Sequence, residues 1–251
     1  MNITGNTILI TGGTSGIGKA LAEALHARQN KVIIAGRRQQ LLDQVTAANP
    51  GMIGLQLDVD DKGSIEQFAA QVQRQFPELN VLINNAGIMR AEDYTAEKVD
   101  VATAEATLTT NISSVVRLTA ALLPTLKAQP KATLMATTSG LAHVPMAAFP
   151  TYSGTKAFLH AWLEAVRFQL RNTNVEVLEL TPPYVQTDLT GSHQANDPRA
   201  MPLDEFITEV MQILESGNTP KGEILVERVK PLRWAEKNGS YEQLLTALGS
   251  Q

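Results

Sequence analysis

The sequence predicts an α/β protein with a doubly wound parallel sheet of about seven strands, helices on both faces, and a single domain over residues 1–251. Three observations favour this fold class. Short runs that are apolar throughout alternate with longer amphipathic runs, a pattern typical of strands buried on both faces. A glycine-rich turn joins the first strand to the first helix. The length of 251 residues fits one α/β domain, and no linker interrupts it.

The predicted strands are rich in aliphatic residues and are bounded by turn residues. They cover Thr7–Thr11, Lys31–Gly36, Met52–Asp58, Val81–Gly87, Ala132–Gly140, Val175–Leu180 and a short last strand, Glu223–Val226. A predicted helix follows each of the first five, and the first of these, Gly16–Gln29, carries one apolar stripe. Right-handed crossovers then join the strands into one parallel sheet.

The chain beyond the sixth strand has a looser pattern. Residues 183–202 are rich in turn residues and predict a mobile substrate loop. A helix over Leu203–Leu214, the last strand and a helical tail complete the domain.

The composition excludes several classes of function. The formal net charge is −4 and no basic run stands out, which argues against nucleic acid as a partner. The chain has no cysteine, so disulfides and thiolate chemistry are excluded. Neither a signal-peptide pattern nor an apolar run of the roughly eighteen residues that a membrane span needs is present. We therefore expect a cytoplasmic protein with no membrane partner.

The turn Gly12–Gly18 has the spacing G-x-x-x-G-x-G. Glycines let the backbone turn sharply and approach a phosphate, and the N–H groups of the following helix favour negative charge. The alternative is a glycine-rich turn that binds nothing. Its position between a strand and a helix favours dinucleotide binding.

Two tyrosine–lysine pairs share a four-residue spacing, Tyr152–Lys156 and Tyr94–Lys98. A phenol with a pKa of about 10 is a poor base, and a cation within about 4–6 Å lowers that pKa. Residues four apart share one helix face, so the spacing suits proton transfer. Ser139, at the end of a predicted strand, adds a hydroxyl at the carboxyl edge of the sheet, where it would orient a substrate oxygen. Tyr94 lies in an acidic loop without such a serine, so we predict Tyr152–Lys156 as the proton-transfer pair, the alternative being an ordinary exposed helical pair.

Taken in order, these motifs resemble the short-chain dehydrogenase/reductase family. The resemblance rests on T-G-x-x-x-G-I-G at Thr11–Gly18, NNAG at Asn84–Gly87, Asn111, Ser139 and Y-x-x-x-K at Tyr152–Lys156. Beyond residue 180 the chain is most similar to the DltE-like oxidoreductase subgroup. The resemblance implies a Rossmann-type sheet, a nicotinamide cofactor and a small carbonyl or alcohol substrate.

The resemblance also implies catalytic roles for four residues, Asn111, Ser139, Tyr152 and Lys156. Tyr152 would be the acid/base, and Lys156 would lower its pKa and hold the nicotinamide ribose. Ser139 would orient the substrate, and Asn111 would anchor a water. Asn111 lies in TLTTNISS, a poor helix-forming stretch, where a local break would free a carbonyl to hold water. A surface asparagine is the alternative.

The second predicted strand ends in AGRR, without the acid that takes the ribose hydroxyls in NAD-binding folds of this type. A guanidinium binds a 2′-phosphate, so NADP is favoured over NAD, with Arg37 as the first choice and Arg38 as the second. The alternative is that the two arginines are simply solvated. Thr14 stands where some NADP-binding relatives carry a second basic residue, so the phosphate would be held by basic side chains from one side only. The full set of predicted cofactor contacts is Gly12, Thr14, Ser15, Gly16, Ile17, Arg37, Arg38, Asp58, Val59, Asn85, Ala86, Gly87, Tyr152, Lys156, Pro182, Val185 and Thr187. No metal ligand is predicted.

One motif departs from the family pattern. Pro182-Pro183 stands where the family usually has Pro-Gly, and because proline fixes φ and lacks an N–H, the backbone near the nicotinamide would bend differently. His143 is the lone titratable residue of an otherwise apolar predicted pocket, where a polar loop residue is favoured over a catalytic histidine.

The sequence therefore predicts an NADP-dependent oxidoreductase that transfers a hydride between the nicotinamide and a carbonyl or alcohol, with Tyr152 as acid/base. A catalytically silent NADP-binding sensor or scaffold is one alternative, since fold does not fix function. An NADP-dependent isomerase or lyase is another. Apolar residues on more than one face of the two long helices predict a homodimer.

Overall fold

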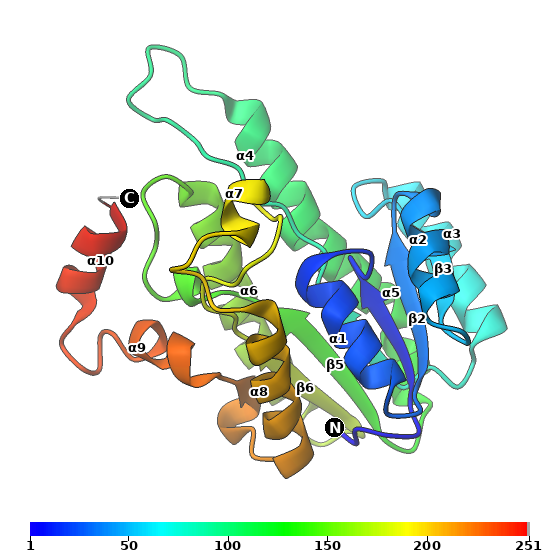
Figure 1. The fold of residues 1–251 in the computed structure, drawn as a ribbon. Coiled ribbons are helices and arrows are strands. Elements are labelled where there is room, and N and C mark those ends of the chain that lie inside the picture. Colours follow the sequence, from blue (N-terminus) through cyan, green and yellow to red (C-terminus); the bar gives the residue numbers. More distant parts are fainter. Residues whose placement is uncertain (250–251) are drawn as a thin grey trace.

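The structure, a computed structural model, describes residues 1–249 and shows a central sheet covered by helices on both faces (Figure 1). Within those residues the sheet has seven parallel strands in the order β3-β2-β1-β4-β5-β6-β7. The strands are β1 (Thr7–Thr11), β2 (Lys31–Gly36), β3 (Ile53–Gln56), β4 (Val81–Asn84), β5 (Ala132–Thr137), β6 (Val175–Leu180) and β7 (Glu223–Ile224). The order reverses between β1 and β4, and ligands bind at the carboxyl ends of the strands beside such a switch point. The predicted fold class is confirmed.

The two faces of the sheet have separate apolar cores, because successive side chains of a strand point to opposite faces. Ile8 and Ile10 belong to one core, whereas Leu9, between them, belongs to the other. The first core is covered by α1 (Gly16–His26), α2 (Gln39–Ala48) and α8 (Leu203–Ser216), and the second by α3 (Lys62–Gln75), α5 (Ser114–Lys127) and α6 (Pro150–Leu170). The remaining helices are α4 (Val101–Leu108), α7 (Ser192–Ala195), α9 (Lys230–Arg233) and α10 (Tyr241–Gly249). In residues 1–249, no helix combines the length and the apolar character that crossing a membrane requires.

Several strands are shorter than predicted at their carboxyl ends. The ladder of β4 stops at Asn84 because the next backbone N–H groups, those of Asn85 and Ala86, donate to Thr11 Oγ1 at 3.0 and 3.1 Å. Ser139 was predicted to end β5, but the strand stops at Thr137, two residues earlier. The Ser139 hydroxyl accepts a hydrogen bond from Leu141 N and caps the short helix η2 (Gly140–Ala142). Asn85, Ala86 and Ser139 therefore lie just beyond the ends of the strands.

Residues 183–202 are more structured than a plain loop. They contain α7 and an isolated bridge between Val185 and Met201. Gln194 is buried, and its amide donates to the Val185 carbonyl at 2.8 Å and to Thr187 Oγ1 at 3.1 Å. The mobility of this segment stays a prediction.

The C-terminal tail lies against the loop that follows β5. A Cβ built at Gly140 would lie 2.6 Å from Leu232 Cδ1 and 3.1 Å from Val229 Cγ2. Val229 ends η4 (Glu227–Val229), and Leu232 lies on α9. The tail therefore packs closely on the residue next to Ser139, and a side chain at Gly140 would require Leu232 to shift.

Candidate active site

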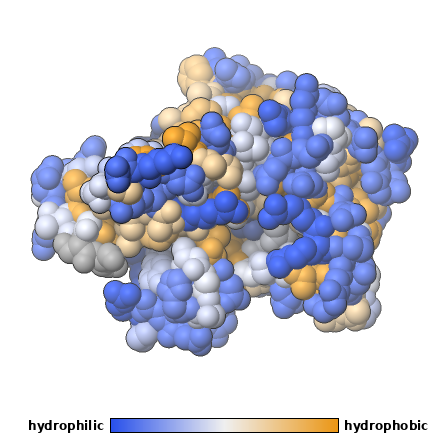
Figure 2. All heavy atoms as spheres, turned by 90° about the horizontal axis from the view of Figure 1, so that it is seen from above, coloured by the Kyte–Doolittle hydropathy of each residue, from blue (hydrophilic) through white to orange (hydrophobic). Residues whose placement is uncertain are grey.

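The face above the carboxyl ends of the strands holds the predicted catalytic residues. Seen from above, this face has a mostly hydrophilic rim, with apolar side chains gathered in and beside a central hollow (Figure 2). Tyr152 and Lys156 reach it from the first turns of α6, and Ser139 from the loop after β5. All three are buried. The structure thus brings this predicted set together.

The tyrosine is held as a neutral phenol. Burial raises the pKa of Tyr152 to about 12, and a side-chain hydrogen bond with Ser139 partly offsets that rise. Lys156 Nζ donates to the Thr137 carbonyl at 2.8 Å and lies 5.5 Å from the centre of the Tyr152 ring. Burial lowers the pKa of Lys156 to about 8. The expected lowering of the Tyr152 pKa by Lys156 is therefore not seen here: the ammonium lies over the ring and is itself desolvated.

Asn111 lies in a break in the helix that leads to α5. Residues Thr109–Ser113 form a π-helical turn, η1, as the poor helix-forming stretch predicts. The Asn111 side chain accepts from Ile88 N at 2.9 Å and donates to Ile88 O at 3.0 Å and Thr155 Oγ1 at 3.1 Å. Thr155 Oγ1 in turn donates to the Tyr152 carbonyl at 2.7 Å. Asn111 thus ties the loop after β4 to the first turns of α6, and its water-anchoring role stays a prediction.

The glycine turn is packed against the loop after β4. Gly12 and Gly16 have φ of +67° and +51°, which glycine adopts without strain. A Cβ at Gly18 would lie 2.3 Å from both Asn85 Nδ2 and the Gly12 carbonyl. Ser15, before α1, makes no side-chain capping bond within the described residues. These features fit a pyrophosphate, which would take the uncapped N–H groups of the first turn.

The edge beside β2 holds the predicted 2′-phosphate contacts. Arg37 is exposed, and its guanidinium lies 3.4 Å from the Asp60 carboxylate. Arg38 precedes α2 and is exposed. Thr14 lies beside Gly36, where a Cβ would be 3.1 Å from Thr14 Cγ2. Asp60 is an acid that sequence reasoning missed, because it lies beyond β3 rather than at the end of β2.

Asp58 and Val59 follow β3 on the same edge. Asp58 N–H donates to Ser64 Oγ at 3.1 Å, and Asp58 Oδ1 accepts from Asp60 N at 3.0 Å. Asp58 also lines a surface hollow with Arg37 and Gln56.

The opposite edge is formed by the residues after β6. Pro182 O accepts from Gly140 N at 2.9 Å, so the Pro-Pro segment is bonded to the loop that carries Ser139. Thr187 lies 3.4 Å from the position that a Cβ would take at Gly16. Gly87, in the loop after β4, lies close to two predicted catalytic residues, since a Cβ there would lie 3.3 Å from Asn111 Oδ1 and 3.8 Å from Lys156 Nζ.

Two residues set aside by sequence reasoning have clear places. Tyr94 is 61% exposed in the loop before α4, so the structure does not bring it to the site. Burial lowers the pKa of His143 to about 4, with the charges of His160 and Arg233 adding to the effect. The imidazole of His143 is therefore neutral and half-buried, which agrees with the prediction of a polar loop residue rather than a catalytic histidine.

Two functional positions were missed, Thr11 and Thr155. The Thr11 hydroxyl accepts from two backbone N–H groups of the loop after β4. The Thr155 hydroxyl accepts from the Asn111 side chain and donates to the Tyr152 carbonyl of its own helix. The sequence offered one indication of both positions: Thr11 directly precedes Gly12 in the glycine motif, and Thr155 directly precedes Lys156 in Y-x-x-x-K.

Comparison with the sequences of known proteins agrees with the family resemblance of the motifs. Residues 6–198 match the family model described as short chain dehydrogenase. The chain is 37% identical to the uncharacterized oxidoreductase DltE of Bacillus subtilis, with 100% of this chain and 99% of that protein covered. It is 33% identical to serine 3-dehydrogenase of Agrobacterium fabrum, with 76% of this chain and 78% of that enzyme covered.

Solved structures share the fold. A short chain dehydrogenase from Burkholderia cenocepacia in complex with NADP superposes with a TM-score of 0.81 at 24% identity, covering 98% of both chains. The closed form of a serine dehydrogenase complexed with NADP⁺ superposes with a TM-score of 0.76 at 24% identity, covering 82% of this chain and 88% of that one.

Proposed function

This chain belongs to the short-chain dehydrogenase family and is an oxidoreductase of CH–OH or C=O groups, and on that premise we propose that it uses NADP, with Tyr152 as the acid/base. One observation carries the proposal. The side chains of Tyr152 and Ser139 are both buried and lie close enough for Ser139 to lower the pKa of Tyr152, and Lys156 Nζ lies 5.5 Å from the centre of the Tyr152 ring. A substrate oxygen placed between two such donors would be polarised from both.

The residues suggest how the proton moves. A bound nicotinamide supplies or accepts the hydride. During reduction the Ser139 hydroxyl orients the carbonyl oxygen, and the Tyr152 phenol donates its proton to that oxygen. A pKa of about 12 keeps this phenol protonated at neutral pH, as a proton donor must be. Oxidation of an alcohol needs the phenolate, so Lys156 would have to stabilise it.

The preference for NADP rests on the edge beside β2. That strand ends at Gly36 without an acid, and Arg37 is free to turn toward a 2′-phosphate because its contact with Asp60, at 3.4 Å, is long and exposed. The similar structures from Burkholderia cenocepacia and of the serine dehydrogenase are NADP complexes. The cytoplasmic location and the homodimer stay predictions.

The test is the oxidation of NADPH against a panel of ketones, aldehydes and quinones, with the reverse reaction followed on alcohols that include serine. We expect turnover with at least one class of substrate. A sensor or scaffold would bind NADPH without oxidising it, and an isomerase or lyase would convert its substrate without net redox change.

A further inference from the structure

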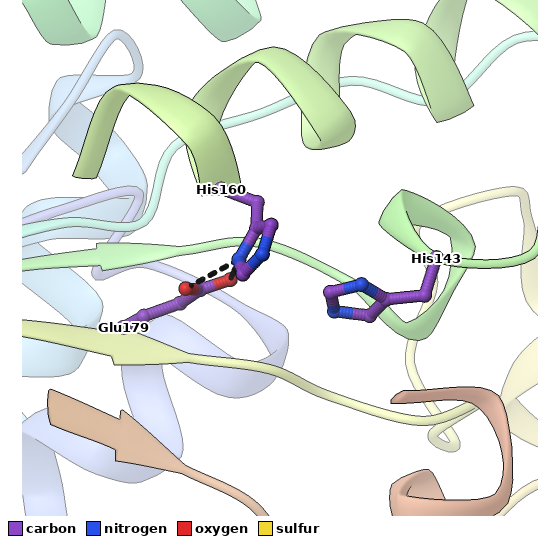
Figure 3. A group of neighbouring side chains, drawn as sticks. All are labelled: His143, His160 and Glu179. Atoms are coloured by element: carbon purple, nitrogen blue, oxygen red, sulfur yellow. Dashed lines mark hydrogen bonds and ion pairs between the residues drawn. The ribbon is translucent and has the colours of Figure 1, made fainter. Parts of the chain in front are cut away.

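Three side chains outside the proposed catalytic set meet behind the loop of Ser139: His143, His160 and Glu179 (Figure 3). His143 follows η2, His160 lies on α6, and Glu179 lies on β6. One possible ligand atom from each side chain lies within 4.8 Å of the other two. The residues are too far apart in the chain to form a spacing motif, so only the fold brings them together.

His160 and Glu179 already have the spacing of two metal ligands. His160 Nδ1 lies 2.8 Å from one carboxylate oxygen of Glu179 and 3.1 Å from the other. A zinc ion at about 2.0–2.2 Å from a nitrogen and an oxygen keeps these two atoms about 3 Å apart. Glu179 is fully buried and its carboxylate is hydrogen-bonded by His160, so a metal ion would take the place of the proton on His160 Nδ1.

His143 offers a nitrogen that lacks a partner. Its Nε2 is buried and makes no hydrogen bond within residues 1–249. Its ring meets the His160 ring edge-on, with 4.7 Å between the ring centres. Leaving a buried polar atom unpaired costs free energy, and a metal ion would supply the missing partner.

His160 and Glu179 each have a further polar neighbour, and the hydrogen bond to Glu179 is of the kind that orients a metal ligand. Glu164 Oε1 lies 3.9 Å from His160 Nε2, the ring nitrogen that faces away from Glu179. Thr138 Oγ1 donates to Glu179 Oε1 at 2.7 Å. The nearby cation Arg233 is already ion-paired with Glu223 at 2.6 Å, which limits its repulsion of a metal.

We propose that His143, His160 and Glu179 form a site for one divalent transition-metal ion of the zinc type. Two imidazoles and one carboxylate suit zinc, whereas calcium and magnesium prefer oxygen ligands. Binding draws the His143 ring toward the other two side chains and leaves a fourth position for water. Because His143 shares its loop with Ser139, the ion would tether that loop to α6 and β6.

The test uses full-length, tag-free protein that has been treated with a chelator. Zn²⁺ is titrated by calorimetry, and Co²⁺ by its visible absorption. We expect one ion per chain, and a loss of affinity of at least about tenfold in His143→Ala, His160→Ala and Glu179→Gln. His26→Ala and His193→Ala, which change the other two histidines, should bind like the wild type.

A thermal scan separates loss of the ion from loss of the fold. Zn²⁺ should raise the melting temperature of the wild type and of the two control variants, but not that of His143→Ala, which changes a half-buried loop residue. The anomalous signal at the zinc edge in crystals should lie between the three side chains. Absence of stoichiometric binding to the wild type, or equal binding by all variants, would overturn the proposal. NADPH binding, measured in parallel, is independent of this outcome.

Discussion

Tyr152 and Tyr94 have the same spacing to a lysine, and their surroundings alone separate them. Tyr152 is buried close to Ser139, which lowers its pKa, whereas Tyr94 is 61% exposed. Tyr152→Phe keeps the ring but removes the proton, so turnover should fall by at least about a hundredfold while NADPH binding is kept. Tyr94→Phe is the matched control and should change little. Steady-state kinetics with fluorescence titration of NADPH would check both, and near-normal turnover in Tyr152→Phe would contradict the mechanism.

Cofactor choice is a second property that we expect single residues to decide. In the double variant Gly36→Asp with Arg37→Ser, the acid would repel a 2′-phosphate and accept from a free ribose hydroxyl. A charge-assisted contact of about 1.5–3 kcal/mol implies a preference of about ten- to a hundredfold for NADPH in the wild type, which this variant should reverse.

Gly36→Ala is the necessary control for that experiment. A Cβ at Gly36 lies only 3.1 Å from Thr14 Cγ2, so the single variant separates crowding from charge. Side-by-side titration of the wild type with NADPH and NADH is the measurement, and equal affinities would show that the arginines face only solvent.

Lys156 makes the stability of the cofactor-free protein depend on pH. Its pKa is about 8 in the folded chain against 10.5 in the reference state, so from about pH 8 to pH 10.5 the unfolded chain binds more protons. The free energy of unfolding should therefore rise with pH in that window. Relative to Lys156→Met, the wild type should gain about 2–3 kcal/mol between pH 7 and pH 10. Urea unfolding of both proteins at several pH values would check this, and parallel curves would refute it.

At the scale of elements, two helical glycines should respond in opposite ways to the same change. Gly18→Ala would place a Cβ 2.3 Å from Asn85 Nδ2 and the Gly12 carbonyl, so it should separate the glycine turn from the loop after β4 and weaken NADPH binding. Gly154→Ala meets nothing within 4 Å on the exposed side of α6. It should stabilise the protein by up to about 1 kcal/mol. Thermal unfolding and NADPH titration of both variants are the measurements.

The strands and helices themselves were largely predictable from the sequence. Each apolar run is long enough to form one buried strand, and the amphipathic runs carry an apolar stripe that packs on the sheet. The carboxyl ends of the strands were not predictable. There the Asn85 N–H leaves the ladder to bind Thr11 from another segment, and Ser139 turns out of β5 to accept from Leu141 N in the next loop; no strand pattern records such contacts. Ion pairs such as Arg37–Asp60 were missed for the same reason, as was the meeting of His143 with His160.

At the scale of the whole molecule, apolar side chains remain uncovered on two helices. Phe158 and Phe168 on α6 are 42% and 67% exposed, and Val101 and Leu108 on α4 are also exposed. Exposed apolar residues of this kind mark association surfaces, so we expect a homodimer through these helices. Light scattering at micromolar concentration should give twice the chain mass.

A charge placed on that surface should dissociate the predicted dimer. Phe158→Asp should shift the mass toward that of a monomer, whereas Tyr94→Phe, on the exposed loop before α4, should not. A monomeric wild type would contradict the prediction.

The packing of the tail on Gly140 has a consequence for the order in which the protein is made. Leu232 and Val229 are synthesised after every strand of the described sheet, yet they support the loop that carries Ser139. Residues of β1 to β6 can pair while synthesis continues, since chains fold from the N-terminus onward. The serine, in contrast, reaches its final surroundings only after Val229 and Leu232 have been synthesised and can pack on Gly140. We expect a chain ending at Val226 to bind NADPH but turn over little, and adding the missing segment back as a peptide offers a direct measurement of how late in its production this enzyme becomes active.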